Sequence, residues 1–582
     1  MPGFIAEIAK KHITKNFGNS RTDGLVTGTI TDGKTYTVER RTIPKFLNDK
    51  AFYENDDYIV LTEGVILNSL ALQEKYIGSK ESNADKLAET IIAMYQKNGE
   101  QLFSEFRGSF SGLFFDKKKD VWLIYTNHIG DKQVFYTKTE DGYAFASEVT
   151  WLTDYRKNCG LSYTLDVDGA YFLLTYAFML EDHTLFNEIK KVSAGQYVRI
   201  ERGDFSVRRY HRLDNTPNEN ETEEEIIERM DVLFRNAVRL EFEKDREYGY
   251  KHFASLSGGL DSRMTVWVAH ELGYTEQLNY TVSQCDYLDE QIAKSIARDL
   301  KHDWMFKSLD NGNYLCGVVD EMVDLQFGNV FCGGSSHVRS FMLNFNCDEY
   351  GLHHSGQLGD AVLGTYLSTD KKDVRHNFLG AGAYSNLLLD RINNFKLADS
   401  YENSEIFKFY NRGFTGILQG NLGFQEYTEV ASPFLDVDFM EYCLHIPAKY
   451  RIGEQIYMKW IIKKYPDATA YKWEKIDARI TDKWVHILGR HILLKKLPKL
   501  IMRKLFRQNQ LAKATGSMNP LDYWYATNPR LKSSMDRYYK TAIQNTPPHL
   551  HELKRDMETL YAGTCIEKLQ VLTLLGAFKK YF

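Results

Sequence analysis

The chain has 582 residues, of which 43% are hydrophobic and 26% charged, and its formal net charge is −5. This length predicts two or three domains with sizeable cores, and the acidic balance argues against a nucleic-acid partner. The longest apolar run, residues 170–180, is too short to span a membrane, and Glu7 interrupts the region where a signal peptide needs an apolar core. We therefore expect a cytoplasmic protein.

The first part of the chain, residues 1–213, alternates short β-type runs with turns. A helix with one apolar face is predicted around residues 87–95. Three runs predict strands on either side of it, namely residues 58–61, 111–115 and 121–125. Strands flanking a helix favour a layered α+β domain. The polar segment 214–222 then predicts a linker.

From residue 223 to about 470 the pattern changes to alternating helices and strands. The predicted order is helix 226–242, strand 252–256, helix 264–272, strand 278–282, helix 290–300 and a strand from Trp304. This alternation is typical of an α/β, doubly wound parallel sheet, whose ligands lie at the carboxyl ends of the strands. Residues 471–582 are interpreted as a helical extension.

A basic, apolar run lies inside this extension, at residues 484–507. We favour a helix with a basic face or a loop, because Pro498 interrupts the periodicity. Binding to an anionic membrane surface or to an acidic substrate stays open as an alternative.

The most specific motif is Ser257-Gly258-Gly259-Leu260-Asp261-Ser262, between a predicted strand and a helix. Such a turn aims backbone N–H groups at one point on the positive end of the helix dipole. Its glycines allow a phosphate to approach the backbone, and Asp261 adds a carboxylate for a divalent cation. No Gly-Lys-Ser/Thr follows, so the motif predicts an ATP-pyrophosphate site rather than a Walker-type loop.

Two later motifs extend this pattern: SGQLGD at residues 355–360 and PFLD at residues 433–436. Together with SGGLDS they resemble the asparagine synthetase family, which normally shows SGEGSDE and VPFLD. Five N-terminal segments are similar to the glutaminase-like domain of that family: residues 64–68, 106–110, 128–132, 145–148 and 184–186. The resemblance implies an Ntn-hydrolase-like sandwich in 1–213 and an ATP-pyrophosphatase domain in 223–470.

The resemblance also implies cofactors and site residues. ATP and Mg²⁺ are expected, with Asp261 and Asp360 as metal ligands. The implied nucleotide-binding residues are Ser257, Gly258, Gly259, Asp261, Ser262, Val282, Ser355 and Gly356. Lys459 would stabilise the adenylation and acyl-transfer transition states. Glu429 is a candidate partner for the acceptor amine or for Lys459, and a structural ion pair is the alternative.

The N-terminal part departs from the family at three catalytic positions. Pro2 stands in place of the nucleophilic cysteine, whose thiolate would attack the glutamine amide. Glu63 replaces the asparagine that stabilises the oxyanion, and Leu87 falls where an acidic residue holds the glutamine amine. We predict an inactive glutaminase that serves as scaffold.

The ATP-binding part departs from the family where the substrate is held. Gln357 and Ala361 replace two glutamates, and Ala431 replaces an arginine, which suggests a carboxylate other than aspartate. The sequence thus predicts an ATP-dependent ligase that adenylates a small-molecule carboxylate, releases pyrophosphate and passes the acyl group to ammonia or an amine, as in the β-lactam synthetase branch. An ammonia-using asparagine synthetase and a non-catalytic nucleotide-binding protein are the alternatives, and a homodimer is an open option.

Overall fold

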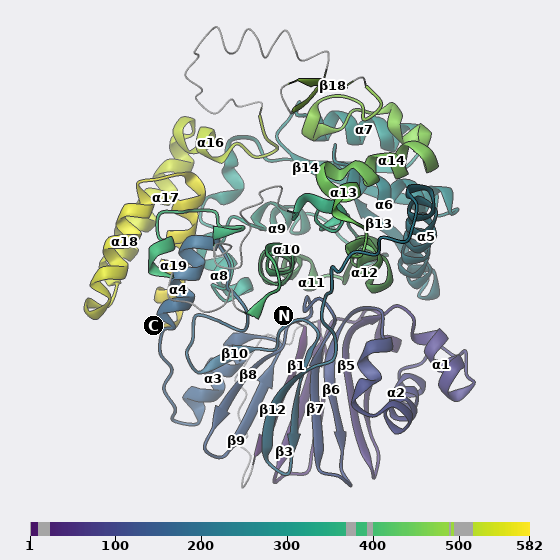
Figure 1. Cartoon of the computed structure of the whole chain (residues 1–582). Coiled ribbons are helices and arrows are strands. Elements are labelled where there is room, and N and C mark those ends of the chain that lie inside the picture. Colours follow the sequence, from purple (N-terminus) through teal and green to yellow (C-terminus); the bar gives the residue numbers. More distant parts are fainter. Residues whose placement is uncertain are drawn as a thin grey trace.

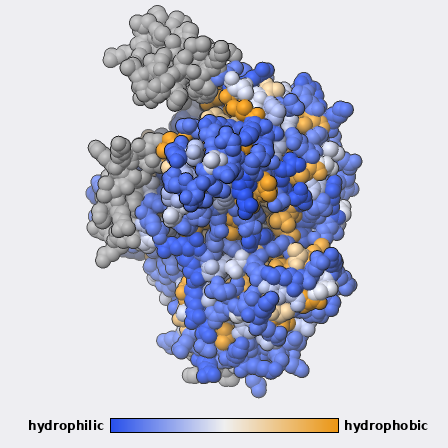
Figure 2. All heavy atoms as spheres, turned by 45° about the vertical axis from the view of Figure 1, so that its right-hand side comes forward, coloured by the Kyte–Doolittle hydropathy of each residue, from blue (hydrophilic) through white to orange (hydrophobic). Residues whose placement is uncertain are grey.

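The computed structural model describes residues 2–9, 24–367, 380–392, 400–482, 484–487, 490–493 and 516–582. Within them the chain forms a sandwich of strands, a parallel sheet with helices beside it, and a group of C-terminal helices (Figure 1). No helix among these residues is long and apolar enough to cross a membrane. The face in Figure 2 is mainly hydrophilic, with hydrophobic residues scattered over it.

The N-terminal sandwich consists of two antiparallel six-stranded sheets, in the orders β10-β8-β9-β1-β3-β2 and β12-β11-β7-β6-β5-β4. Side chains from the facing sheets, such as Phe4 and Leu113, form a fully buried core between them. The strands are β1 (Gly3–Ala9), β2 (Val26–Thr31), β3 (Tyr36–Thr42), β4 (Phe52–Glu54), β5 (Tyr58–Ile66), β6 (Gly108–Asp116), β7 (Val121–Thr126), β8 (Phe135–Thr139), β9 (Gly142–Ala146), β10 (Ile189–Lys191), β11 (Gln196–Glu201) and β12 (Asp204–Arg209).

Helices cover the outer faces of both sheets. α1 (Ser69–Ile77) and α2 (Ala84–Asn98) lie on the second sheet, and α2 begins where the Asn83 side chain accepts a backbone N–H. α3 (Val149–Asn158) packs on β8 and β9. The layered α+β sandwich expected from the sequence is confirmed.

The helix α4 (Val167–Tyr176) connects the sandwich to the C-terminal helices. Its residues from Gly169 to Tyr176 are all buried, and it packs against α19 (Cys565–Tyr581), of which 14 residues are buried. A helix that is apolar all round must be covered on every side. The last helices of the chain therefore share one core with the N-terminal part.

The second region is a five-stranded parallel sheet, β13 (Lys251–Ser255), β14 (Gln277–Ser283), β15 (Asp303–Ser308), β16 (Tyr350–His354) and β17 (Val430–Ala431). The strand order is β15-β14-β13-β16-β17, and every pair is parallel. The order reverses between β13 and β16, which is the switch point where open α/β sheets bind ligands. The predicted parallel sheet is confirmed.

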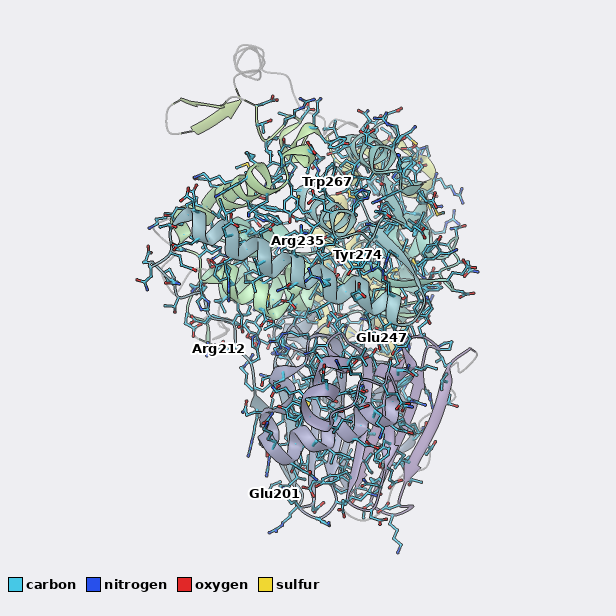
Figure 3. All side chains as sticks on the ribbon, turned by 90° about the vertical axis from the view of Figure 1, so that its right-hand side faces the viewer. Glu201, Arg212, Arg235, Glu247, Trp267 and Tyr274 are labelled. Carbon is cyan, nitrogen blue, oxygen red and sulfur yellow. The ribbon has the colours of Figure 1, made fainter. Side chains whose placement is uncertain are left out.

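Three helices join or flank these strands: α5 (Glu223–Glu247), α6 (Leu260–Glu271) and α7 (Leu288–Leu300). A capping box of Thr222 and Glu225 starts α5, and residues 211–221 before it contain no helix or strand. Figure 3 shows α5 crossing the upper half, with Glu247 near the sandwich. The Lys244 ammonium lies 3.3 Å from the Asp49 carboxylate, so α5 is anchored to the sandwich. The domain boundaries themselves stay a prediction.

The rest of the described chain is mainly helical. Residues 409–416 form a π-helix. The other helices are α8 (Val319–Gln326), α9 (Ser336–Met342), α10 (Ser404–Lys408), α11 (Leu422–Gln425), α12 (Val437–Leu444), α13 (Ala448–Arg451), α14 (Gln455–Lys464), α16 (Leu521–Thr527), α17 (Pro529–Ala542) and α18 (His551–Tyr561).

The predicted basic segment 484–507 begins differently from the helix we considered. Its described part is an antiparallel hairpin of β18 (Trp484–Ile487) and β19 (Arg490–Leu493). Residues 494–507 lie outside the described residues. The aromatic and β-branched residues at 484–487 favour a strand, and this local preference outweighs the lysine and leucine spacing on which the helix was predicted.

Candidate active site

The SGGLDS turn follows β13 at the switch point and is held by its own serines. The Ser257 N–H donates to Ser262 Oγ at 3.0 Å, and the Gly259 N–H donates to Ser257 Oγ at 3.2 Å. Helix α6 then starts at Leu260, and the N-cap residue Gly259 has no side chain that could cap it. A turn that is fixed internally and ends in an uncapped helix start is suited to an anion.

The SGQLGD turn follows β16 and lies directly against the first turn. A Cβ atom on Gly356 would come within 2.4 Å of the Ser262 backbone nitrogen, and one on Gly359 within 2.7 Å of Asp261 Cγ. Only glycine permits this approach. Between the two glycines, Leu358 has φ +61°, a strained conformation that is found most often at functional sites.

This contact brings the two predicted metal ligands together. The Asp360 N–H donates to Asp261 Oδ2 at 3.0 Å, and Asp360 Oδ2 accepts from the Thr365 hydroxyl at 3.0 Å. Burial raises the pKa of Asp261 well above its usual value, and the Asp360 charge raises it further. No lysine or arginine in the described chain pairs with either carboxylate. Oxygen ligands in such a pair fit a divalent cation such as Mg²⁺.

The other predicted nucleotide-binding residues surround the same edge of the sheet. Val282 lies at the carboxyl end of β14. The Ser355 N–H and hydroxyl both donate to the Ala431 carbonyl, at 2.9 and 3.0 Å, which ties β16 to β17. Beyond Val282, the Gln284 N–H donates to the Met518 carbonyl at 2.9 Å. The C-terminal part of the chain therefore borders the site.

Lys459 does not lie beside the aspartates. Its ammonium pairs with Glu223 at 2.5 Å, and its side chain is 46% exposed. Tyr457, two residues earlier on α14, is fully buried, and the charge of the nearby Asp261 adds to burial in raising the pKa of Tyr457. Residues two apart project about 200° apart around a helix, so Lys459 points away from the side that faces the site. Its catalytic role stays a prediction that this geometry does not support.

Glu429 is the buried ion pair that we considered as an alternative, and its partners are not Lys459. Its carboxylate lies 2.6 Å from Lys132 Nζ and 3.0 Å from Lys50 Nζ, and all three side chains are buried. Glu63 lies 3.5 Å from the same Lys50. We call Lys50, Glu63, Lys132 and Glu429 the interdomain charge cluster, because Glu429 precedes β17 and the others belong to the sandwich.

Comparisons with known proteins agree with this architecture. A model of the glutamine amidotransferase domain matches residues 47–211. Asparagine synthetase (glutamine-hydrolyzing) 1 of Bacillus subtilis is 26% identical over 269 residues, which cover 45% of this chain and 41% of that protein. A Methanocaldococcus jannaschii protein, named as asparagine synthetase (glutamine-hydrolyzing) 2, is 25% identical over 333 residues, 55% of this chain and 62% of its own length.

These comparisons support an asparagine synthetase family member with an N-terminal amidotransferase domain, because the domain model and the similar proteins point to the same family. The chain spans about two fifths to three fifths of the length of these two relatives. The match to a solved glutamine phosphoribosylpyrophosphate amidotransferase from B. subtilis covers 53% of this chain and 91% of that protein, at 11% identity and with a TM-score of 0.26.

Two residues of the candidate site are missed by sequence reasoning. Asp289, at the start of α7, accepts the Gly258 N–H at 2.7 Å, and burial raises its pKa to about 6. Its position after the carboxyl end of β14 is the signal that could have found it, but a lone aspartate there reads as a helix cap. Tyr457 looks like an ordinary core residue of α14.

A lysine is also connected to the aspartate pair through a glutamate. Lys475 pairs with Glu454. Burial raises the pKa of Glu454, and the Asp360 charge contributes to the shift. Lys475 is therefore the cation connected to the site through a buried carboxylate, whereas Lys459 pairs with Glu223 at the start of α5.

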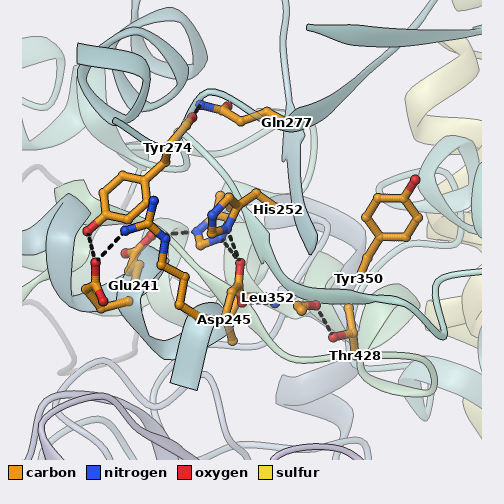
Figure 4. Close-up of polar contacts among 12 residues, drawn as sticks. Glu241, Asp245, His252, Tyr274, Gln277, Tyr350, Leu352 and Thr428 are labelled. Atoms are coloured by element: carbon orange, nitrogen blue, oxygen red, sulfur yellow. Dashed lines mark hydrogen bonds and ion pairs between the residues drawn. The ribbon is translucent and has the colours of Figure 1, made fainter. Parts of the chain in front are cut away.

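A buried histidine cluster lies at the end of β16, and Figure 4 labels Glu241, Asp245 and His252 of this cluster. Asp245 Oδ2 bonds His252 Nδ1 at 2.9 Å and His354 Nε2 at 2.7 Å, and His354 Nδ1 lies 3.3 Å from Glu241. Burial alone would lower the pKa of His354, but these carboxylates raise it to about 9. Asp245 and the histidines could hold a metal, yet a protonated His354 satisfies the cluster. It fixes the end of β16, immediately before Ser355.

Proposed function

We propose that the protein is an ATP-dependent amide-forming ligase. The observation that carries this proposal is the pair Asp261 and Asp360, joined by a 3.0 Å hydrogen bond between two glycine turns at the switch point of a parallel sheet. A phosphate-accepting turn beside two cation-binding carboxylates suits a reaction in which pyrophosphate leaves.

The chain's own residues have separate tasks in this reaction. The turn 257–262 and Gly356 hold the phosphates of ATP, and Asp261 with Asp360 hold Mg²⁺. The cation supplies neutralising charge when pyrophosphate departs. Tyr457 is buried near Asp261, and Asp289 fixes the turn through the Gly258 N–H.

The proposed chemistry has two steps. A substrate carboxylate oxygen bonds the α-phosphorus while the bond to the β-phosphate oxygen breaks, giving an acyl-adenylate and pyrophosphate. Ammonia or an amine then attacks the acyl carbon, AMP leaves with the bonding electrons, and the amine loses its proton to a base. The ligase is therefore AMP-forming.

We include in the proposal that the amidotransferase domain does not hydrolyse glutamine. Besides Pro2, Glu63 supports this part of the proposal. Its carboxylate is buried beside Lys50 and accepts the Thr42 hydroxyl at 2.9 Å, so the position implied for the oxyanion-stabilising asparagine holds a structural ion pair. Leu87 is fully buried in the core under α2 and cannot hold a substrate amine. The nitrogen then comes from solution, a partner protein or an amine substrate.

The second candidate is asparagine synthesis from aspartate and free ammonia, which the names of the relatives favour. Against it, Ala361 is fully buried and Ala431 presents its carbonyl to Ser355, so neither supplies the charge that a zwitterion requires. A cytoplasmic location and a homodimer stay predictions from the sequence.

ATP–pyrophosphate exchange across a panel of carboxylates, with Mg²⁺, tests the proposal. Exchange with an acid other than aspartate is the expected result. Exchange with aspartate alone would identify the asparagine synthetase, and no exchange with any acid would leave a nucleotide-binding protein. Release of glutamate from glutamine would contradict the inactive amidotransferase.

A further inference from the structure

A pocket with a volume of about 130 Å³ lies outside the residues of the proposed active site. Its walls come from the segment after α4, the end of α8, the segment that follows it, and the π-helix 409–416. The residues that line it include Phe178, Gln326, Phe331, Tyr384, Arg412 and Gly416.

Gln326 gives this pocket an unsatisfied acceptor. The residue is 0% exposed, and its amide nitrogen donates to Ser335 Oγ at 2.6 Å. Its Oε1 atom is buried and has no hydrogen-bond partner. Leaving a buried acceptor unpaired is costly, so a ligand group that donates a hydrogen bond to this oxygen would be favoured.

Arg412 gives the pocket a cation. Its guanidinium lies 5.3 Å from the Tyr384 ring centroid, and one nitrogen donates to the Gly382 carbonyl at 3.2 Å. No carboxylate of the described chain forms an ion pair with it. A guanidinium with donors to spare is the preferred partner of a carboxylate, which it binds through two parallel hydrogen bonds.

The remaining walls are apolar and closely fitted. A Cβ atom on Gly416 would lie 2.8 Å from Phe178 Cδ1, so a glycine is needed for this ring to line the pocket. Phe331 and Tyr384 face each other with ring centroids 5.8 Å apart. The volume is close to that of an apolar cavity of about 150 Å³ that binds benzene.

The pocket is connected to the aspartate pair through two contacts. A Cβ atom on Gly413, next to Arg412, would lie 3.3 Å from Leu358 in the SGQLGD turn. Tyr366 lies between the two groups electrostatically: burial raises the pKa of Tyr366, the Arg412 charge opposes the shift, and the Asp360 charge adds to it. Arg412 is therefore the charged lining residue whose neighbours connect the pocket to the metal ligands.

We propose that this pocket is the acyl-donor subsite, and that it selects an acid with a compact, benzene-sized apolar group carrying a hydroxyl or amino donor. Arg412 would bind the carboxylate of the acid before adenylation. The aromatic walls would contact its apolar group, and Gln326 Oε1 would accept a hydrogen bond from its hydroxyl or amino group. This inference rests on the proposed function. Aspartate fits the pocket poorly, because it brings a second carboxylate and no apolar group.

The test compares 4-hydroxybenzoate, benzoate, branched aliphatic hydroxy acids and L-aspartate in ATP–pyrophosphate exchange. We expect exchange with a donor-bearing apolar acid, and we expect R412Q to raise its KM about 10-fold or more, with partial recovery in R412K. Q326L should abolish a preference of about 10-fold for the donor-bearing acid over its analogue without the donor. R537Q, an exposed arginine on α17, is the matched control and should change KM less than twofold.

The outcomes separate this inference from the proposed function. If an acid supports exchange but R412Q and Q326L leave its KM and the preference unchanged, the ligase stands and the subsite is wrong. If no acid supports exchange, equilibrium binding of the same acids decides whether the subsite exists without the ligase activity. Binding that is lost in R412Q but kept in R537Q would retain the subsite without the ligase, and no binding would overturn both.

Discussion

Two clusters of buried carboxylates differ in whether neighbouring side chains neutralise their negative charge. In the interdomain charge cluster, two glutamates face two lysines, and although burial would raise the pKa of Glu429, the lysines lower it. At the switch point, Asp261 and Asp360 face each other, and burial with mutual repulsion raises the pKa of Asp261. The first cluster is neutral by itself, whereas the second has no lysine or arginine partner among the described residues.

This difference separates scaffold from active site. A self-neutralised cluster joins the start of β17 to the sandwich and needs no ligand. It includes Glu63, to which the sequence resemblance assigns the family's oxyanion position. An uncompensated pair costs stability and is retained where a ligand supplies the missing charge. The comparison therefore predicts that substitutions in the two clusters have opposite effects on activity and on stability.

The largest effect is expected on activity at the switch point. D261N removes one ligand charge from the cation site and should lower ATP–pyrophosphate exchange by about 100-fold or more. The measurement is the exchange rate with saturating Mg²⁺ and acid. D303N is the matched control, because Asp303 is exposed at the opposite, amino edge of the same sheet. An exchange rate in D261N within threefold of wild type would remove Asp261 from the metal site.

The next effect is on stability in the interdomain charge cluster. E429Q leaves Lys50 and Lys132 buried with only Glu63, and breaking a buried ion pair typically costs about 3–5 kcal/mol. We expect a clear drop in the urea midpoint, measured by tryptophan fluorescence. In the control E349Q, which breaks the exposed pair with Lys251, the midpoint should not move. An unchanged midpoint in E429Q would mean that the cluster does not hold the two regions together.

The two clusters should also respond to pH with opposite signs. Because the folded pKa of Glu429 is lowered, its contribution is present above its unfolded pKa and is lost as pH falls through the folded value. Because the folded pKa of Asp261 is raised, its contribution is present at low pH and is lost as pH rises through that value. Without Mg²⁺, D261N should therefore raise Tm near pH 8, by roughly 2–4 °C for each kcal/mol gained, and leave it unchanged near pH 4.

Mg²⁺ sharpens this third prediction. Added at pH 8, the cation should raise the Tm of wild type, because it binds only the folded site, and should raise that of D261N much less. An equal Mg²⁺ response in both proteins would place the cation elsewhere.

Much of the site could be predicted from the sequence, because its motifs are local. The SGGLDS and SGQLGD turns each carry their glycines and aspartate within six residues, and strand periodicity places both at carboxyl ends. The reversal of strand order between β13 and β16 brings them together. The parallel sheet and the layered sandwich follow from the same local signals.

The parts that sequence reasoning missed depend on long-range packing. Glu429 pairs with lysines about 300 and 380 residues away in the chain, and no local pattern marks such partners. Gln326 and Arg412, 86 residues apart in the chain, line the same pocket only because the fold brings the end of α8 and the π-helix 409–416 to its walls. The segment 484–493 formed a hairpin because a short run of aromatic and β-branched residues outweighed helical spacing.

The smallest expected effect concerns the lysine that the sequence favoured. K459M removes an exposed ammonium that pairs with Glu223, so exchange should change less than about twofold, as is usual for exposed ion pairs. K475M removes the cation that reaches the site through Glu454 and should lower exchange about 10-fold or more. Circular dichroism would show that both variants fold. A large loss in K459M alone would mean that α14 turns Lys459 toward the phosphates during the reaction, and the assignment of the two lysines would be reversed.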